Sequence, residues 1–223
     1  LTPEQFGSLS SEQMQSLSTR ALADLGSTLW SAVGSAEFAA LSTSQLAALG
    51  SAPLASTQLD TLTSSELAVL SSRTIASIAP TAFATLDTTQ LAGLTSGQAS
   101  ALTTAQIAAL NSTQFDGLTS AAIGALTSAQ LRALTSDTFA SLSTSQITAI
   151  NTRAFAGLAS AQIAALSSEQ IGSLTTALLA LLSSAAVAGL TTEDLGARES
   201  SDIAAISSRA IVGLSTANIA ALG

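Results

Sequence analysis

Serine and threonine hydroxyls are the commonest groups in this chain that are able to act as nucleophiles. A hydroxyl needs a nearby general base, usually His or Lys, before it attacks a substrate. The chain of 223 residues contains no His, no Cys and no Tyr, and its six basic residues are all Arg. It therefore also lacks the thiolate and imidazole ligands that hold zinc. The sequence predicts a protein that is not an enzyme and that holds no cofactor.

One cluster of acidic side chains near the C-terminal end has the composition of a cation site. Its members are Glu193, Asp194, Glu199 and Asp202. Calcium takes roughly six to eight oxygen ligands, and the spacing of these four residues matches neither an EF-hand loop nor the Gly-rich nonapeptide of calcium-binding β-rolls. A solvated polar face is the favoured interpretation, and a calcium site is the alternative.

The charge and hydropathy exclude two classes of partner. Fourteen acidic and six basic residues give a formal net charge of -8, so the surface repels polyanions and we expect no nucleic-acid partner. A membrane-spanning helix needs roughly 20 mostly apolar residues, whereas Ser or Thr interrupts this chain in every repeat, so we expect no membrane span. The first ten residues lack the basic and apolar regions of a signal peptide. Any export signal is expected outside this segment.

The whole chain follows an eight-residue period. Six octads occupy residues 1–48, a five-residue interruption occupies residues 49–53, and twenty-one octads occupy residues 54–221. A fixed short period indicates an array of small units, each of which buries its apolar face only against its neighbours. We therefore predict one continuous repeat array without separate domains.

Positions 1 and 6 of the octad carry the apolar side chains. Position 1 is nearly always Leu, and position 6 is mostly Ile, Leu or Phe. Positions 7 and 8 are mainly Ala, Gly and Ser, which suits close approach between neighbouring elements. The predicted core residues in the regular part of the array are Leu102, Ile107, Leu110, Phe115, Ile147, Phe155 and Ile163.

Position 2 has the residue types of a helix N-cap. It is Ser, Thr, Asn, Asp or Gly in 23 of 27 octads, which is the set that caps prefer. Position 5 is Gln or Glu in 14 octads, so each cap meets the partner of a capping box three residues later. Pro3 and Pro80 stand at position 3, which is then the first helical residue and the place that tolerates Pro best. The predicted caps include Thr103, Asn111, Thr119, Thr127 and Asn151.

The octad therefore predicts a helix of about six residues that ends at the next cap. A continuous helix would rotate the apolar stripe by about 80° per octad, and a continuous strand would place positions 1 and 6 on opposite faces. Because so short a helix is unstable alone, the helices must stack. We predict an all-α fold, a compact α-solenoid with one capped helix per octad. Positions 5 and 6 alternate between residues 126 and 165, which suggests two octads per coil, with three or four octads per coil as the alternatives. A β-solenoid is the alternative.

Three places disturb the period. Residues 17–40 keep the spacing but lose several caps, so the helices there are expected to merge or fray. Residues 49–53 shift the phase and are expected to form a kink. Arg198 replaces a core Leu, and we expect its side chain to extend outward to water.

The segments at residues 102–110 and 166–174 resemble repeat tracts in very large secreted or surface proteins of Gram-negative bacteria, which are often labelled as adhesins or haem-utilisation exoproteins. The resemblance covers nearly the whole chain, apart from residues 17–40. It implies an extracellular or cell-surface stalk, spacer or fibre, and it carries over no catalytic or ligand-binding residue.

These observations predict a non-catalytic rod, stalk or filament segment that stacks end to end on copies of itself or on neighbouring repeats. Position 3 is Ser or Thr in 25 of 27 octads, and capping does not account for this second hydroxyl. Regular ranks of these hydroxyls suggest a first alternative, an ice- or surface-binding solenoid. A repeat module that binds a peptide or glycan is the second alternative.

Overall fold

The structure, a computed structural model, describes residues 2–196 and 198–222. Every regular element among these residues is a helix of four to six residues, and none of them is a strand. Each helix begins at position 3 of its octad, directly after the cap position. The prediction of an all-α solenoid with one short helix per octad is confirmed, and the β-solenoid alternative is wrong.

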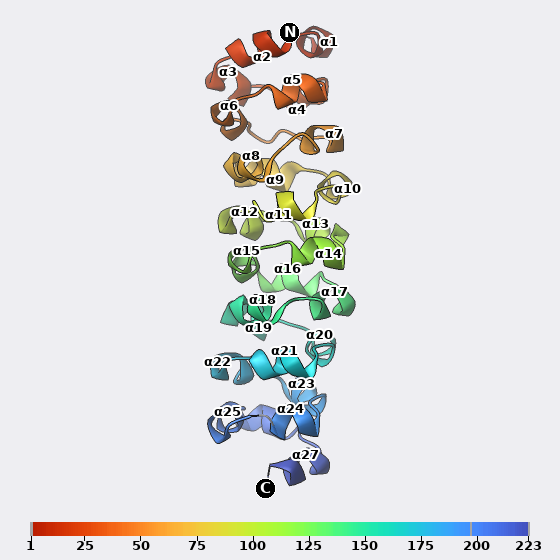
Figure 1. The fold of residues 1–223 in the computed structure, drawn as a ribbon, viewed down its shortest axis with the longest axis vertical. Coiled ribbons are helices and arrows are strands. Elements are labelled where there is room, and N and C mark those ends of the chain that lie inside the picture. Colours follow the sequence, from red (N-terminus) through yellow and green to blue (C-terminus); the bar gives the residue numbers. More distant parts are fainter. Residues whose placement is uncertain (1, 197, 223) are drawn as a thin grey trace. The chain divides into compact units, whose positions relative to one another are not determined.

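The chain forms two compact units, Leu1–Ala122 and Ile123–Gly223. Their helices are labelled in Figure 1. The helices of the first unit are α1 (Pro3–Gly7), α2 (Ser11–Ser16), α3 (Thr19–Ala23), α4 (Ser27–Trp30), α5 (Ser35–Ala39), α6 (Thr43–Ala47), α7 (Ser56–Leu59), α8 (Ser64–Val69), α9 (Ser72–Ser77), α10 (Pro80–Phe83), α11 (Thr88–Leu91), α12 (Ser96–Ala101), α13 (Thr104–Ala109) and α14 (Ser112–Asp116). The boundary between the units falls within α15 (Ser120–Ala125). The helices of the second unit are α16 (Ser128–Arg132), α17 (Ser136–Ala140), α18 (Thr144–Ala149), α19 (Thr152–Ala156), α20 (Ser160–Ala164), α21 (Ser168–Ser173), α22 (Thr176–Leu179), α23 (Ser184–Ala188), α24 (Thr192–Gly196), α25 (Ser200–Ala205), α26 (Ser208–Ile211) and α27 (Thr216–Ala221).

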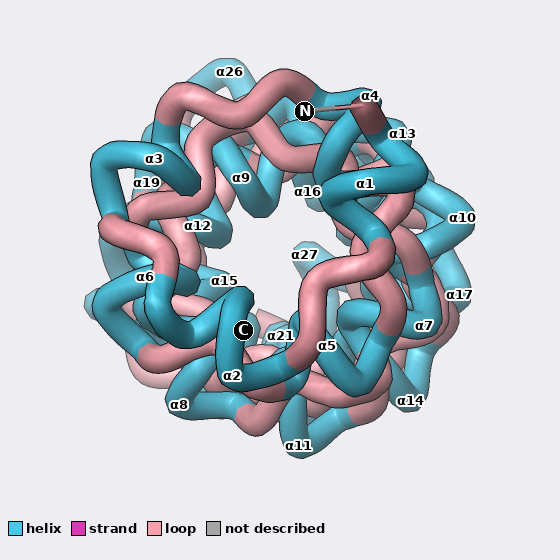
Figure 2. The backbone as a smooth tube through the Cα atoms, turned by 90° about the horizontal axis from the view of Figure 1, so that it is seen from above, coloured by secondary structure: helices cyan, strands magenta, loops and turns pink. Residues whose placement is uncertain are grey.

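Three successive helices make one coil of the solenoid. Within the first unit α9 packs against α12, α10 against α13 and α11 against α14, and within the second unit α18 packs against α21 and α23 against α26. In the axial view, α9 and α12 accordingly lie close together on one side, and α10 and α13 on another (Figure 2). The suggestion of two octads per coil is wrong, because each short helix turns the chain through roughly a third of a circle rather than half of one.

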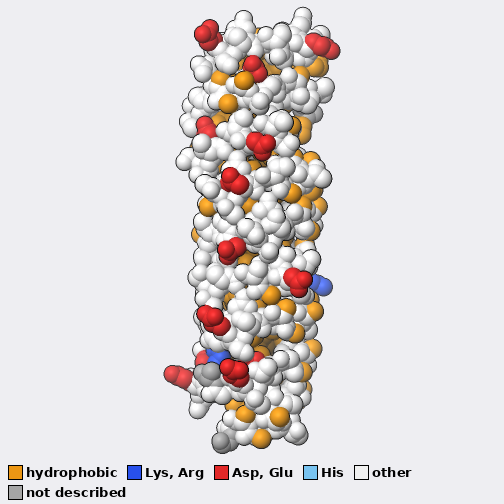
Figure 3. All heavy atoms as spheres, turned by 45° about the vertical axis from the view of Figure 1, so that its right-hand side comes forward, with side chains coloured by type: hydrophobic (Ala, Val, Ile, Leu, Met, Phe, Trp, Pro, Cys, Tyr) orange, Lys and Arg blue, Asp and Glu red, His pale blue; other side chains and the backbone are white. Residues whose placement is uncertain are grey.

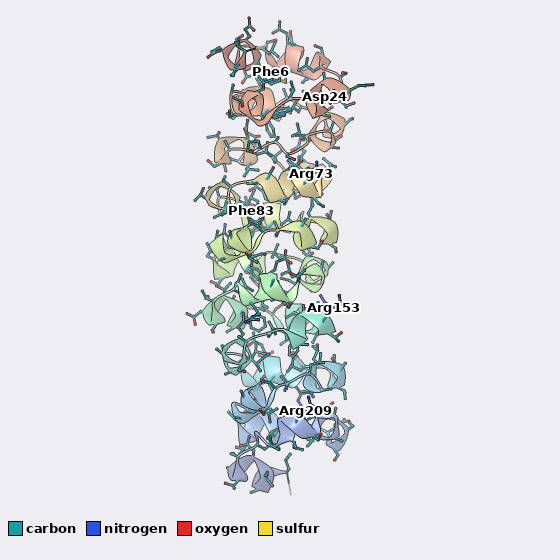
Figure 4. The ribbon with its side chains drawn as sticks, turned by 180° about the vertical axis from the view of Figure 1, so that it is seen from behind. Phe6, Asp24, Arg73, Phe83, Arg153 and Arg209 are labelled. Carbon is teal, nitrogen blue, oxygen red and sulfur yellow. The ribbon has the colours of Figure 1, made fainter. Side chains whose placement is uncertain are left out.

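The side chains of positions 1 and 6 fill the interior of each unit. The exposed fractions of the predicted core residues are 4% for Leu102, 0% for Ile107, 4% for Leu110, 0% for Phe115, 0% for Ile147, 3% for Phe155 and 5% for Ile163. The charged side chains of position 4, such as Arg73, Arg153 and Arg209, are exposed (Figure 4). Position 4 therefore faces water, as the charge pattern indicates.

The two irregular stretches of the first unit, residues 17–40 and 49–53, pack as parts of the stack. Residues 17–40 form the separate helices α3, α4 and α5, and the ring of Trp30 packs edge-on against Phe6 and Phe38 with centroid distances of 6.0 and 6.5 Å. Around residues 49–53, α5 packs against α7 and α6 against α8, two helices apart instead of three. Since Leu49 and Ala52 are 1% and 2% exposed, this segment takes the place of one helix in its coil.

No helix among the described residues has both the length and the apolarity needed to cross a lipid bilayer.

Candidate functional site: the contact between coils

A side-chain cap fixes the start of each regular helix. The hydroxyl of Thr103 accepts a hydrogen bond from the backbone N–H of Gln106 at 3.1 Å, at the start of α13. The same bond to the N–H three residues later is made by Asn111, Thr119, Thr127 and Asn151. These bonds satisfy N–H groups that the first turn of a helix leaves without a partner. Each of these short helices therefore has a defined first residue.

The glutamine at position 5 joins its own helix to the preceding coil. In α13 the Oε1 atom of Gln106 accepts from the N–H of Thr103 at 2.9 Å, which completes a capping box. The Nε2 atom of Gln106 donates to the carbonyl oxygens of Ile75 and Ile78 at 2.8 and 2.9 Å. These two carbonyls lie 31 and 28 residues earlier, at the C-terminal end of α9. We call this pair of donations the glutamine latch.

The latch recurs with a nearly constant spacing in both units. Its other donors, each with its two acceptor carbonyls, are Gln45 (Met14 and Leu17), Gln58 (Trp30 and Val33), Gln90 (Leu59 and Leu62), Gln98 (Leu67 and Leu70), Gln114 (Ala84 and Leu86), Gln162 (Leu131 and Leu134) and Gln170 (Ala140 and Leu142). The last carbonyls of a helix have no partner within it. One glutamine amide thus satisfies an N-terminal donor of its own helix and C-terminal acceptors of a helix in the coil before.

The latch explains why position 5 prefers Gln to Glu. A capping box accepts either residue, yet position 5 holds Gln twelve times and Glu twice. Only Gln carries the Nε2 donor. The latching side chains are buried, with Gln106 at 0% and Gln58 at 1% exposure, except for the half-buried Gln114. A buried amide without partners costs about 1–3 kcal/mol. This preference is the sequence signal for the latch, and the capping-box interpretation alone overlooks it.

In some octads without a latching Gln at position 5, another side chain bonds to the preceding coil. Ala154 stands at position 5 of α19, and there Asn151 donates from the cap position through Nδ2 to the carbonyls of Gly124 and Leu126 at 2.8 and 3.0 Å. In α9 the hydroxyl of Thr74 donates to the carbonyl of Leu49 at 2.7 Å. At Ala154 the change at position 5 therefore reflects which side chain bonds to the preceding coil, not how many helices form a coil.

Small residues at position 8 allow the backbones of stacked helices to approach closely. A Cβ atom on Gly117 would lie 2.9 Å from the Cα of Thr88 in the preceding coil, and one on Gly93 would overlap the carbonyl group of Ser64. Thr88 and Ser64 occupy position 3. One hydroxyl of that position, in Ser96, donates to the carbonyl of Ala121 at 3.1 Å. The close approach accounts for a small residue at position 3, and this bond accounts for its hydroxyl in one octad.

Arg198, at a core position, is buried rather than extended to water. Its side chain is 6% exposed, and its Nη1 atom donates to the carbonyl of Leu174 at 2.8 Å and lies 3.5 Å from Oδ2 of Asp202. The expectation that this side chain extends outward is wrong, because a backbone carbonyl of the preceding coil and a carboxylate one turn away provide partners inside the stack.

The four acidic residues of the candidate calcium site have separate surroundings. Asp194 is 6% exposed and accepts at Oδ2 from the N–H of Thr191 at 2.7 Å. Burial raises the pKa of the Asp194 carboxyl, but the hydrogen bonds from Thr191 and the charge of Arg198 outweigh burial, so this pKa lies below its usual value. Glu193 and Glu199 are exposed, and Asp202 pairs with Arg198. The described residues contain no group of three or more His, Cys, Asp or Glu side chains arranged to hold a metal ion.

The sequence model of the ALTTAQ repeat family matches residues 100–128, 107–144 and 139–176. The six letters of the family name occur as residues 101–106, which contain the cap Thr103 and the latch residue Gln106. The matched segments are therefore similar to a repeat family in the part of the chain where the octads are most regular. No curated protein sequence matches the chain.

Proposed function

We propose that this chain is a non-catalytic structural repeat that serves as a stiff spacer, stalk or filament segment in an extracellular or cell-surface assembly of a bacterium. The observation that carries the proposal is the glutamine latch. Side-chain hydrogen bonds between coils recur in both units, beside layers of buried Leu, Ile and Phe. An array that is held in this way resists bending within each unit, because bending would break buried hydrogen bonds.

The side chains with hydroxyl and amide groups have structural roles. The hydroxyls at position 2 cap helices, and the amides at position 5 cap the helix ends of the preceding coil. A general base of the His or Lys type does not occur in the chain. The match to the ALTTAQ repeat family supports the same assignment, because short tandem repeats commonly build solenoids.

The ice- or surface-binding alternative receives less support. Because three helices form a coil, consecutive helices lie on different sides of each unit (Figure 2). Only every third octad can therefore contribute hydroxyls to one rank. A thermal-hysteresis assay tests this alternative directly, and no hysteresis is expected.

Small-angle X-ray scattering from the monomeric chain tests the proposal. The described residues form 27 helices, or nine coils at three helices per coil. The spacer proposal requires the stack to continue from one unit into the other, and a helix spacing of about 8–10 Å then predicts a rod of roughly 70–90 Å. A uniform rod of about 80 Å has a radius of gyration of at least about 23 Å, whereas a globular domain of the same length would have about 17 Å. A radius near the globular value, or a scattering curve of a flexible chain, would contradict the spacer function.

A further inference from the structure

One buried latch position carries a carboxylate instead of an amide. Position 5 of α24 is Asp194, where Gln106 of α13 donates to the preceding coil. Acidic side chains are scattered over the face of the molecule drawn in Figure 3, whereas Asp194 is only 6% exposed. Its Oδ2 atom accepts from the N–H of Thr191 at 2.7 Å, as in a capping box. Its Oδ1 atom is buried and has no hydrogen-bond partner among the described residues.

Asn218 shows what a side chain of this length reaches from position 5. It stands one coil later, in α27, which packs against α24. Its Nδ2 atom donates to the carbonyl oxygen of Leu190 at 2.8 Å, 28 residues earlier. The same spacing assigns Asp194 to the carbonyl of Leu166, which follows α20 as Leu190 follows α23, and α20 packs against α23. The equivalent pair of atoms in the earlier coil is therefore Oδ1 of Asp194 and the carbonyl oxygen of Leu166.

Both atoms of this pair are hydrogen-bond acceptors. Leu166 is 9% exposed, and no described residue donates to its carbonyl oxygen. An ionised carboxylate has no proton to donate, so Asp194 cannot bond to Leu166 directly as Asn218 bonds to Leu190. Buried acceptors in native proteins have a donor, either from the protein or from ordered water, because an unpaired one is costly. A small molecule that donates to both oxygens is therefore needed between them.

The charges around this pair determine which molecule fits. Burial acts to raise the pKa of the Asp194 carboxyl, but hydrogen bonds from Thr191 and Ser168 and the charge of Arg198 lower this pKa below its usual value. The carboxyl is therefore ionised at neutral pH. The side chain of Arg198 is also buried, and its Nε and Nη2 atoms have no hydrogen-bond partner among the described residues. A cation is repelled by Arg198 and an anion by Asp194, so a neutral molecule with two donor protons fits best.

We propose that one ordered water molecule bridges Oδ1 of Asp194 and the carbonyl oxygen of Leu166, in place of the side-chain amide that forms the latch elsewhere. The water donates one proton to each oxygen, and its own oxygen offers lone pairs to the N–H groups of Arg198. Buried waters typically make about three hydrogen bonds to polar groups that have no other partner. Asp194 is one methylene shorter than Gln, which leaves room that the longer side chain would fill. We call this arrangement the hydrated latch.

Oxygen magnetic relaxation dispersion counts long-lived internal waters and tests the proposal on the full chain. This method follows the water oxygen, so exchanging Ser and Thr hydroxyl protons do not contribute. Asp194→Asn is expected to hold one long-lived water fewer than the wild type, because its Nδ2 atom can donate directly to Leu166. Asp194→Gln, which introduces the residue of a full latch, is expected to lose the same water and gives a second measurement if Asp194→Asn folds poorly. Urea unfolding establishes that each variant is folded.

Asp137→Asn is the matched control, because Asp137 is exposed at position 4 of α17, and its count of long-lived waters is expected to equal that of the wild type. Equal counts in the wild type, Asp194→Asn and Asp194→Gln would overturn the hydrated latch. A wild-type melting temperature that rises with Na⁺, K⁺ or Ca²⁺, with no such rise in Asp194→Asn, would assign the bridge to a cation and overturn it as well. An Asp194 carboxyl that titrates above pH 7 by NMR would have the same consequence, because the acid would then donate to Leu166 itself.

Discussion

Replacing Gln106 by Glu isolates the latch from the capping box. The glutamate keeps an oxygen to accept from the N–H of Thr103, so the box at the start of α13 persists. It loses the Nε2 donor and sets a carboxylate against the carbonyl oxygens of Ile75 and Ile78, which the amide of Gln106 now approaches to 2.8 and 2.9 Å. The residue is 0% exposed, so water does not screen this contact.

The expected loss of folding stability in Gln106→Glu has two contributions. Two lost hydrogen bonds at about 0.5–1.5 kcal/mol each give a loss of about 1–3 kcal/mol. A buried charge without a partner raises the total cost to about 3–5 kcal/mol. Urea unfolding monitored by circular dichroism is expected to show a clearly lower midpoint at neutral pH, and hydrogen exchange should increase first in α9, α10 and α13.

The pH dependence separates loss of the donor from general disruption. Burial beside carbonyl oxygens disfavours the carboxylate, so the pKa of the new glutamate is raised above its unfolded value of about 4.3. A protonated carboxyl can donate to a carbonyl as the amide does. The destabilisation relative to the wild type is therefore full above the raised pKa and shrinks as the pH falls towards 4. Gln13→Glu is the control, because that side chain is exposed and forms only a capping box, and a change within about 0.5 kcal/mol is expected. Equal stability of Gln106→Glu and the wild type at neutral pH would refute the latch.

Three further predictions concern the core, the close approach of helices and acid stability. Ile107→Asp buries a charge in a site that is 0% exposed and is expected to lower stability by more than about 4 kcal/mol; an unchanged thermal melt would contradict the core assignment. Gly93→Ala is expected to destabilise the fold, because the new Cβ would overlap the carbonyl of Ser64. In Gly172→Ala the new Cβ meets nothing within 4 Å, so this variant is expected to stabilise α21 by about 0.5–1 kcal/mol. Urea unfolding should therefore give a lower midpoint than the wild type for Gly93→Ala and a higher one for Gly172→Ala. The lowered pKa of Asp194 means that its carboxylate stabilises the fold above the unfolded pKa of about 3.9 and that this contribution is lost as the pH falls through the lower folded value. Asp194→Asn should flatten the stability curve in that acid range, and an identical acid limb for both proteins would count against it.

The helix positions could be predicted from the sequence because each octad contains its own start signal. The cap at position 2, the Pro residues at position 3 and the apolar pair at positions 1 and 6 all act within one octad, so their meaning does not depend on distant contacts. Pro80, for example, is the first residue of α10, as its residue type alone indicates. Local signals of this kind are legible without knowledge of the fold.

The number of helices per coil could not be predicted in the same way. It depends on the angle between successive helices, which is set by the two extended residues between them, such as Leu102 with φ -56° and ψ 141° and Thr103 with φ -75° and ψ 154°. Leu and Thr adopt such dihedrals in many contexts, so their types do not specify a corner of one third of a turn. The choice between two and three helices per coil is made by packing and by the latch.

The partners of the latch and of Arg198 escaped prediction for a related reason. The acceptors are backbone carbonyls of residues such as Ile75 and Leu174, and a carbonyl is present at every residue whatever its side chain. Only the donor can be recognised in the sequence, because position 5 prefers Gln. For Arg198 no such preference exists, because it is a single departure from Leu, and only the structure shows that a carbonyl lies within its reach.

The range of these contacts limits how far a perturbation spreads. Within each unit a helix packs against helices three places away, or two places away around residues 49–53. Its latch reaches 31 residues back at most among the described pairs. Stability is then close to a sum over neighbouring coils, so a weakened latch should open its own coil and the one before it while the others stay folded. The same locality means that adding coils adds length without weakening the contacts already made. A repeat with this property suits a spacer, because a spacer has to become longer without becoming less stiff.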